Sequence, residues 1–200
     1  MTPIEPRLDL SILVDRLQRL VKLDTSVFEE VRLDPSATVP AFFVAASSTF
    51  LAGIGGWLWW VTNELEDGGR VFLLSAIVGS FVSLAFWIIW MAISWLILTQ
   101  LFKEEADWQQ MLRTMGMAAA PQAIAVGMFI PGIDLGIALA SIALFFGLTT
   151  IAIQAVTQAS PARVLVANLG GFAFWATVLG LLATSESPLA PGIFLFNAAG

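Results

Sequence analysis

The sequence predicts an all-α polytopic membrane protein with five transmembrane helices and an N-terminal amphipathic helical segment. Three observations lead to this fold class. Hydrophobic residues make up 58% of the chain and charged residues 12%, which is about half the charged share of an ordinary soluble domain. Residues 71–102 form a run of 32 residues without a charge, whereas a bilayer core needs only about 20 apolar residues. The basic residues also divide unevenly between the two sides of a five-span topology.

Residues 1–36 form a long polar segment, and we expect them to be a cytoplasmic amphipathic helical segment. Its apolar residues recur at helical spacing: Leu10, Leu13, Val14, Leu17, Leu20 and Val21. An amphipathic helix with basic residues next to a membrane typically lies on the membrane surface. Packing on the protein's own loops is an equally good interpretation of the same pattern. The capping-box spacing of Ser26 and Glu29 predicts a second, short helix.

Residues 37–184 are expected to form the five-helix transmembrane domain. The predicted spans are residues 38–61, 71–102, 114–131, 135–157 and 163–183. The second run exceeds one bilayer crossing but lacks the polar turn that two crossings need, so it predicts one tilted or protruding helix. Pro121 should kink the short third span. Residues 185–200 are expected to be a short extracytoplasmic tail, which Phe194, Leu195 and Phe196 hold to the surface.

Small residues and breaks within the spans indicate where helices approach one another closely. Small side chains at four-residue spacing let two membrane helices come into backbone contact. The candidate helix-packing residues are Ala52, Gly56, Ser75, Gly79, Ser83, Pro121, Gly170 and Gly171.

The distribution of basic residues predicts the orientation. With five spans, the N-terminal segment and the loops after the second and fourth spans share one side and carry eight of the nine basic residues. Only Arg70 lies on the other side. The positive-inside rule therefore places the N-terminus in the cytoplasm and the C-terminus outside, with the chain in the cell inner (plasma) membrane. A four-span topology would break this division.

The residue types that are absent argue against catalysis. The chain has no Cys, His or Tyr, so it offers no thiolate or imidazole metal ligand and no Ser-His triad. It carries no phosphate-loop or dinucleotide-binding glycine motif. The net charge is −6 and no basic patch is present, so a nucleic-acid partner is not expected. We predict no enzymatic activity, no catalytic or metal site and no cofactor.

Two sets of polar residues offer other roles. Glu29, Glu30 and Asp34 form an acidic cluster before the first span; it is the candidate contact for a basic partner surface, although such charges more often form a solvated rim. Apart from Arg163 at the first position of the fifth, the predicted spans contain no ionisable residue, so Gln122 and Asn168 are among the few polar candidates for a transport path. Interhelical hydrogen bonds explain these two side chains better.

Two segments carry a resemblance to a known family. Residues 28–35 read Phe-Glu-Glu-Val-Arg-Leu-Asp-Pro, and residues 111–116 lead into a Gly116-to-Pro121 spacing with Met117 where the family pattern has tyrosine. In these features the chain resembles the Yip1-domain family, in a bacterial-type, five-span form. The resemblance implies a cytoplasmic N-terminal segment followed by closely spaced membrane helices. Eukaryotic members are associated with vesicle trafficking and prenylated small GTPases, but their acidic Asp-Leu-x-Gly-Pro-like element is not intact here.

Three functions follow from these observations. The preferred one is a non-enzymatic Yip1-like membrane protein that acts as a scaffold or interaction module, through helix packing and a cytoplasmic N-terminal platform. The second is a small accessory or assembly subunit of a larger membrane complex, either energy-transducing or photosynthetic. The third is a transporter or channel. In the first two cases the partners are membrane lipids and other membrane-protein subunits.

Overall fold

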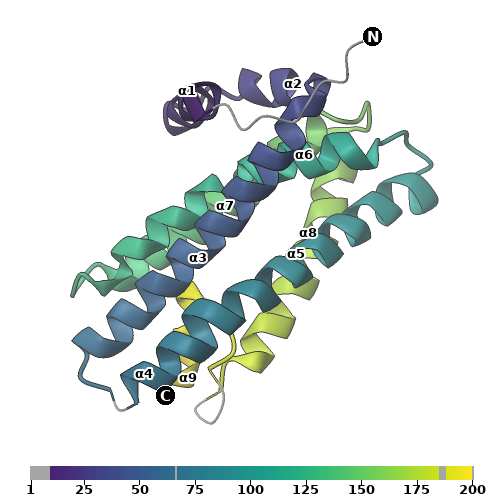
Figure 1. Ribbon diagram of the computed structural model, residues 1–200. Helices are drawn as coiled ribbons and strands as arrows, with labels where there is room; N and C mark the ends of the chain where they lie inside the picture. The colour runs from purple at the N-terminus through teal and green to yellow at the C-terminus, as the bar shows by residue number, and fades with distance from the viewer. Residues whose placement is uncertain (1–9, 66, 185–187, 200) are drawn as a thin grey trace.

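The fold is a bundle of long helices closed at one end by two short ones (Figure 1). The structure is a computed structural model, and it describes residues 10–65, 67–184 and 188–199. Every regular element in these ranges is a helix, which confirms the all-α class. Besides the helices, one isolated bridge joins Ala183 and Pro188.

Among the described residues, four continuous helices are long and apolar enough to cross a membrane: Pro35–Thr62, Gly68–Leu101, Asp134–Gln154 and Pro161–Leu182. The first contains η1 (Pro35–Ala37) and α3 (Thr38–Thr62), and the last two are α7 (Asp134–Gln154) and α8 (Pro161–Leu182). The 34-residue second helix is built from α4 (Gly68–Val71), η2 (Phe72–Gly79), α5 (Ser80–Leu96) and η3 (Ile97–Leu101). The π-helical pieces η2 and η3 interrupt its α-helical hydrogen bonding without ending it.

The predicted third span, residues 114–131, is not a continuous helix of this kind, which corrects the expected count of five. The chain here forms α6 (Trp108–Ala118) and then η4 (Ala120–Phe129), a 3₁₀ helix. Pro121 explains the break, because proline donates no backbone hydrogen bond and its ring clashes with the preceding helical turn. The kink expected from Pro121 is therefore a change of helix type.

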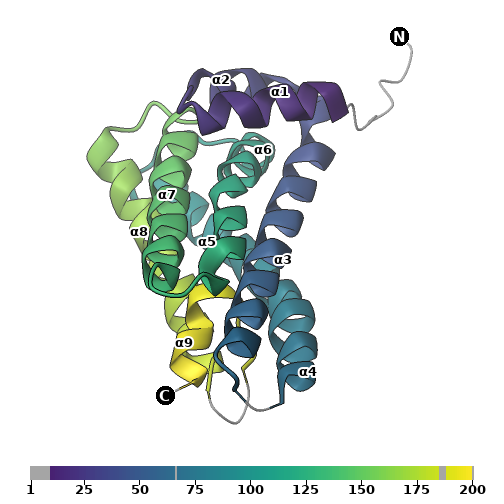
Figure 2. The ribbon, with the colours of Figure 1, turned by 90° about the vertical axis from the view of Figure 1, so that its left-hand side faces the viewer.

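The broken segment nevertheless connects the two ends of the bundle. At one end Arg113 of α6 donates to the carbonyl of Arg32 at 2.7 Å, and at the other end Trp59 donates to Asp134 at 3.0 Å. Figure 2 shows the chain running between these ends, alongside α3 and α7. A 3₁₀ helix rises about 2.0 Å per residue against 1.5 Å in an α-helix, so a short segment reaches further.

Close backbone contact holds this segment against α3. A Cβ added at Gly55 would overlap the Ala125 carbonyl, and one at Gly116 would lie 2.7 Å from the Ala41 carbonyl oxygen. Only glycine fits at these two positions, because the facing atoms belong to the backbone and cannot move aside. The small-residue rule predicts such contacts, but it selected other positions in α3.

The C-terminal segment packs into the bundle, whereas the sequence predicts a tail at the surface. η5 (Gly192–Phe194) and α9 (Leu195–Ala198) follow α8. Ala190 and Leu195 are fully buried. Ser75 of η2 donates a hydrogen bond of 2.8 Å to the Ala190 carbonyl. This end of the bundle is therefore closed by a segment distant in sequence from the helices that it covers.

Candidate functional site: the α1–α2 platform

Helices α1 (Leu10–Val21) and α2 (Ser26–Leu33) form what we call the platform. Figure 2 shows α1 lying across one end of the bundle, roughly perpendicular to α3 and α7. The inner face of the platform is apolar: Leu13, Leu20, Val27, Phe28 and Val31 are buried in one cluster with residues of α3, α6 and α7. Burial of this apolar face stabilises the contact between the platform and the bundle.

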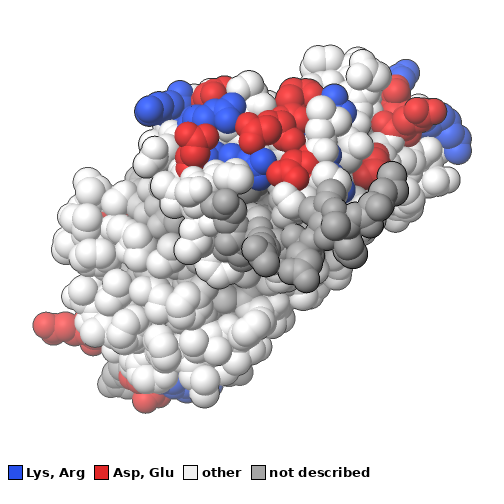
Figure 3. All heavy atoms as spheres, turned by 45° about the horizontal axis from the view of Figure 1, so that its top comes forward, with Lys and Arg blue, Asp and Glu red and all other residues white. Residues whose placement is uncertain are grey.

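Charged side chains gather on the platform end of the molecule. Figure 3 shows blue and red atoms concentrated there, while the flank below is almost uniformly white. A white flank between charged ends is the surface expected for a protein that sits in a bilayer, since charges inside the hydrocarbon are costly.

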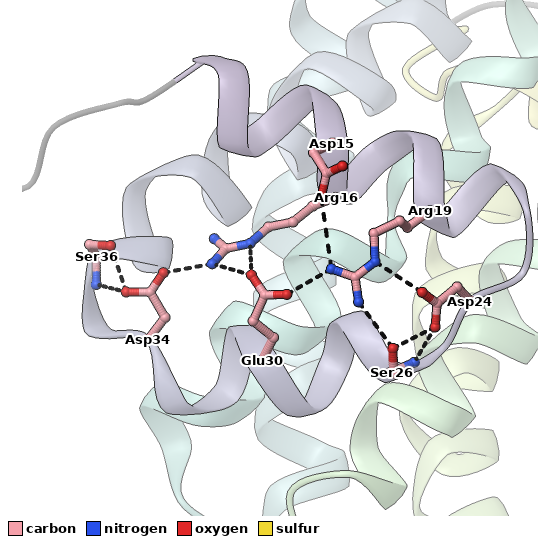
Figure 4. Close-up of polar contacts among 8 residues, drawn as sticks. All are labelled: Asp15, Arg16, Arg19, Asp24, Ser26, Glu30, Asp34 and Ser36. Atoms are coloured by element: carbon pink, nitrogen blue, oxygen red, sulfur yellow. Dashed lines mark hydrogen bonds and ion pairs between the residues drawn. The ribbon is translucent and has the colours of Figure 1, made fainter.

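Arg16 joins the two platform helices. Its side chain is only 7% exposed, and its guanidinium donates to Glu30 at 2.9 Å and to Asp34 at 2.7 Å (Figure 4). The planar guanidinium suits two carboxylates at once. Burial alone would lower the pKa of Arg16, but the hydrogen bonds to Asp34 and Glu30 outweigh it and raise the pKa. Arg16 is therefore permanently charged and fixed in position.

Arg19, one turn later on α1, extends the same network. It donates to Asp24 at 2.9 Å, to Glu30 at 2.8 Å and to the hydroxyl of Ser26 at 3.0 Å. Glu30 thus accepts from both arginines (Figure 4). The turn between the helices is held by Asp24, which also accepts from the backbone N–H of Ser26 at 3.0 Å.

The network lowers the pKa of the carboxyl groups of Asp24, Glu30 and Asp34. The Ser26 hydroxyl and then the Arg19 guanidinium lower the pKa of Asp24 to about 2. The pKa of Glu30 is lowered first by Arg19 and then by Arg16. At Asp34 burial would raise the pKa, but hydrogen bonds from Ser36 and Arg16 outweigh it, and the pKa is lowered. All three groups are ionised at neutral pH.

A third arginine ties the platform to the broken segment. Arg113 of α6 is 6% exposed. It donates hydrogen bonds to the Arg32 carbonyl and, at 3.1 Å, to the hydroxyl oxygen of Thr38. This contact joins the two segments on which the family resemblance rests, since Arg32 lies in residues 28–35 and Arg113 in residues 111–116. These segments are far apart in sequence and adjacent in space.

The acidic residues predicted as a partner contact lie at different places in this arrangement. The carboxylates of Glu30 and Asp34 bind α1, although Glu30 stays 43% exposed. Glu29 lies on the surface and pairs with Arg32 at 2.6 Å. A partner contact at the three residues stays a prediction, in which Glu29 is the most accessible member.

Sequence reasoning missed the structural role of Arg16, Arg19 and Arg113. A usable signal was present for the first two: they are three residues apart on the polar face of α1, and acidic residues lie on the next helix. Arg113 carried no such signal, because its partner is a backbone carbonyl whose position depends on the whole fold.

The predicted packing residues all lie at contacts, but several of these contacts are not between long helices. Cβ atoms built at Gly56 and Gly79 would meet Gly192 and Ala190 of the C-terminal segment, and Ala52 faces Gly192 as well. The remaining contacts are as follows: Ser75 with Ala190, Ser83 with Trp175, Pro121 with Ser141, Gly170 with Ile97, and Gly171 with Trp90.

In the described part of the structure, no open path for a solute leads to the polar residues considered for transport. Asn168 is fully buried; it accepts from Trp90 at 2.9 Å and donates to Thr150 at 2.8 Å and to the Phe146 carbonyl at 3.2 Å. Gln122 lines a cavity of about 20 Å³ with Ser141 and Trp175, which is room for about one water molecule. Asn168 therefore stabilises helix packing, and the described residues show no channel at Gln122.

Residues 10–65, 67–184 and 188–199 contain no group of three or more His, Cys, Asp or Glu side chains that could hold a metal ion.

The long apolar helices and the uncharged flank define an integral membrane protein with a helical-bundle fold. A family model, the Yip1 domain, matches residues 24–187, which includes α2 and all four long helices. The chain belongs to the Yip1 domain family. No curated protein and no solved structure matches it.

Proposed function

We propose that this protein is a non-enzymatic interaction module, in which the membrane bundle holds the platform in place for binding another membrane-protein subunit. The observation that supports this most is the buried Arg16 bridge, which fixes α1 on α2. A helix that only floated on lipid would not need a buried arginine paired with two carboxylates on and just after α2, because removing the guanidinium from water is costly. A fixed orientation matters when a surface must match a partner.

The exposed face of the platform is suited to such contact. Val14 and Leu33 are 49% and 66% exposed, and the charges of Glu29 and Arg32 lie near Leu33 in sequence. Apolar side chains bordered by polar ones are typical of protein interaction sites. The three predicted acidic residues then act at the border of the site, where they select a basic partner surface.

Photo-crosslinking tests this proposal. A photoreactive amino acid replaces Val14 or Leu33 in the full chain, and the control position is Phe81, which is 72% exposed on α5. We expect one discrete protein adduct from the platform positions and only lipid adducts from Phe81. The yield of this adduct should fall in the Glu29→Lys variant, which reverses the local charge. Lipid adducts alone from Leu33 would contradict an interaction platform.

The same experiment separates the alternatives. If Phe81 gives the protein adduct and the platform positions do not, the chain is an accessory subunit packed sideways into a larger complex, as in an energy-transducing or photosynthetic assembly. Transport has no supporting observation, because the cavity at Gln122 has room for about one water molecule.

We further propose that the platform lies on the cytoplasmic side of the inner (plasma) membrane. The platform carries Arg16, Arg19, Lys22 and Arg32, and basic residues favour the cytoplasmic side. Because the chain has no cysteine, a single introduced thiol reports its own location. In intact cells an impermeant maleimide should label Glu64→Cys and spare Gln18→Cys; the opposite pattern would invert the topology.

A further inference from the structure

An apolar groove runs beneath the second half of α1. It measures about 460 Å³, and its walls come from α1, η4 and α7. The lining side chains include Leu20 of α1 and Leu23 of the turn that follows it, and those below include Ala123, Ile124 and Leu148. Figure 1 shows α1 almost end-on beside α7, so that the helix overhangs the flank of the bundle.

Water is a poor occupant for this groove. All ten lining residues are apolar, whereas a bound water molecule needs two to four polar partners. The volume would hold on the order of ten water molecules, none with a side-chain hydrogen bond. The flank of a membrane bundle faces acyl chains, which match the groove in polarity.

A basic side chain lies at the edge of the groove. Lys22 follows Val21 and lines a shallower adjoining depression with Val14, Leu17 and Gln18. It forms no hydrogen bond or ion pair through its side chain within the described ranges, while neighbouring Arg19 is occupied by Asp24 and Glu30. The protein has a net charge of −6, so this lysine is a local positive charge beside an apolar groove, which suits an anionic headgroup.

We propose that the groove binds an acyl chain of an anionic phospholipid, whose phosphate is held by Lys22. The apolar walls of the groove bind the acyl chain, and the Lys22 ammonium binds the phosphate of the headgroup. Both parts of one lipid molecule therefore have a complementary surface. The proposal rests on α1 lying at the membrane interface. It does not require that the platform binds a protein. The two proposals can fail separately because Leu33, unlike Val14, lines neither the groove nor the depression beside Lys22.

The test is native mass spectrometry of the purified full chain with equal amounts of phosphatidylglycerol and phosphatidylcholine. We expect phosphatidylglycerol to be retained about five-fold better, which is the attraction of one basic residue for anionic lipid. Lys22→Gln should remove the preference, because it removes the charge and leaves the groove intact. Lys103→Gln, at another exposed lysine, should preserve the preference.

A second pair of variants tests the groove itself. Ala123→Trp fills it and should abolish lipid retention. The control is Ala46→Trp, which fills a different apolar groove of about 370 Å³ between α3 and the second long helix, and which should leave retention unchanged. Equal retention of both lipids by the wild type, or equal loss in both tryptophan variants, would mean general lipid contact and would overturn the proposal.

A photoreactive amino acid in place of Ile124 identifies the occupant directly. Ile124 is 46% exposed and lines the groove, so the substitution should be tolerated. A phospholipid adduct supports the proposal. An adduct with residues 1–9 of the same chain, or with a second copy, would overturn it.

Discussion

At the scale of single residues, glycines decide how closely the helices approach. A Cβ at Gly171 would overlap the side chain of Trp90 and lie 2.5 Å from its carbonyl oxygen. Trp90 in turn packs edge-to-face against Phe145 and Phe172, with ring centroids 5.0 Å and 5.3 Å away. The indole is therefore held on several sides and cannot yield, which makes this contact sensitive to one added methyl group.

Gly171→Ala should lower the free energy of unfolding by about 2 kcal/mol or more, because it overpacks a rigid contact. Gly180→Ala, on the same helix, should change it by less than about 1 kcal/mol, since a Cβ there meets nothing within 4 Å. Unfolding in mixed micelles of mild detergent and dodecyl sulfate measures both. Similar losses in the two variants would show that the Trp90 contact is not tight.

At the scale of elements, the sequence predicted those helices whose position depends on a local pattern of apolar residues. The apolar runs located α3, α7 and α8, and the spacing of Leu13 and Leu20 indicated an amphipathic α1. The change from α6 to η4 was harder to predict from the sequence, because Pro121 predicts a break but not the type of helix that follows it. The ion pairs of Arg16 depend on how α1 turns back over α2, which no local pattern specifies.

Arg16→Met should loosen α1 on the bundle. The substitution keeps most of the apolar stem and leaves Glu30 and Asp34 without their buried partner, at a cost of about 1–2 kcal/mol, because these carboxylates are partly exposed and can recover water. Hydrogen exchange of α1 amides should then rise about ten-fold. Arg32→Gln removes an exposed pair with Glu29 and should leave the exchange nearly unchanged.

The same network predicts an acid-sensitive platform. The pKa values of Asp24, Glu30 and Asp34 are lowered in the folded protein, so their stabilising contribution is complete above the unfolded values of about 4. It is lost as the pH falls through the folded pKa, which for Asp24 is about 2.

Spin labels at Gln18→Cys and Glu105→Cys measure this loss as a broadened distance distribution. We expect no change between pH 7 and about pH 5, and progressive broadening from about pH 4 downward. In the Arg16→Met background the pKa values of Glu30 and Asp34 return toward normal, so the acid response should shrink. Broadening that begins near pH 6 would point to a different titrating group.

At the scale of the whole molecule, the C-terminal segment completes the bundle. Leu195 is fully buried in a cluster with Val71 and Ala198, against which Trp57 and Trp60 pack. The sequence could not predict this, because a short segment broken by proline resembles a loose tail. Its place is set by contacts with both α3 and η2, which come together only in the folded bundle.

Leu195→Ala should therefore destabilise the whole bundle by about 2–4 kcal/mol, as large-to-small changes in a packed core do. Ala199→Ser, on an exposed residue of the same segment, should stay within about 0.5 kcal/mol. Thermal unfolding in detergent, followed by the loss of helical circular dichroism, compares them. Equal midpoints would mean that the segment is an appendage of the bundle.

The insertion of this segment also sets an order in time. Ser75 and its acceptor Ala190 are 115 residues apart, and a ribosome adds roughly 5–20 residues per second. Between roughly 6 and 23 s therefore pass after Ser75 is made before its partner exists. During that interval the surfaces at Gly56 and Gly79 that the segment later covers lack this contact. Folding of the bundle thus includes a late closing step made by η5 and α9.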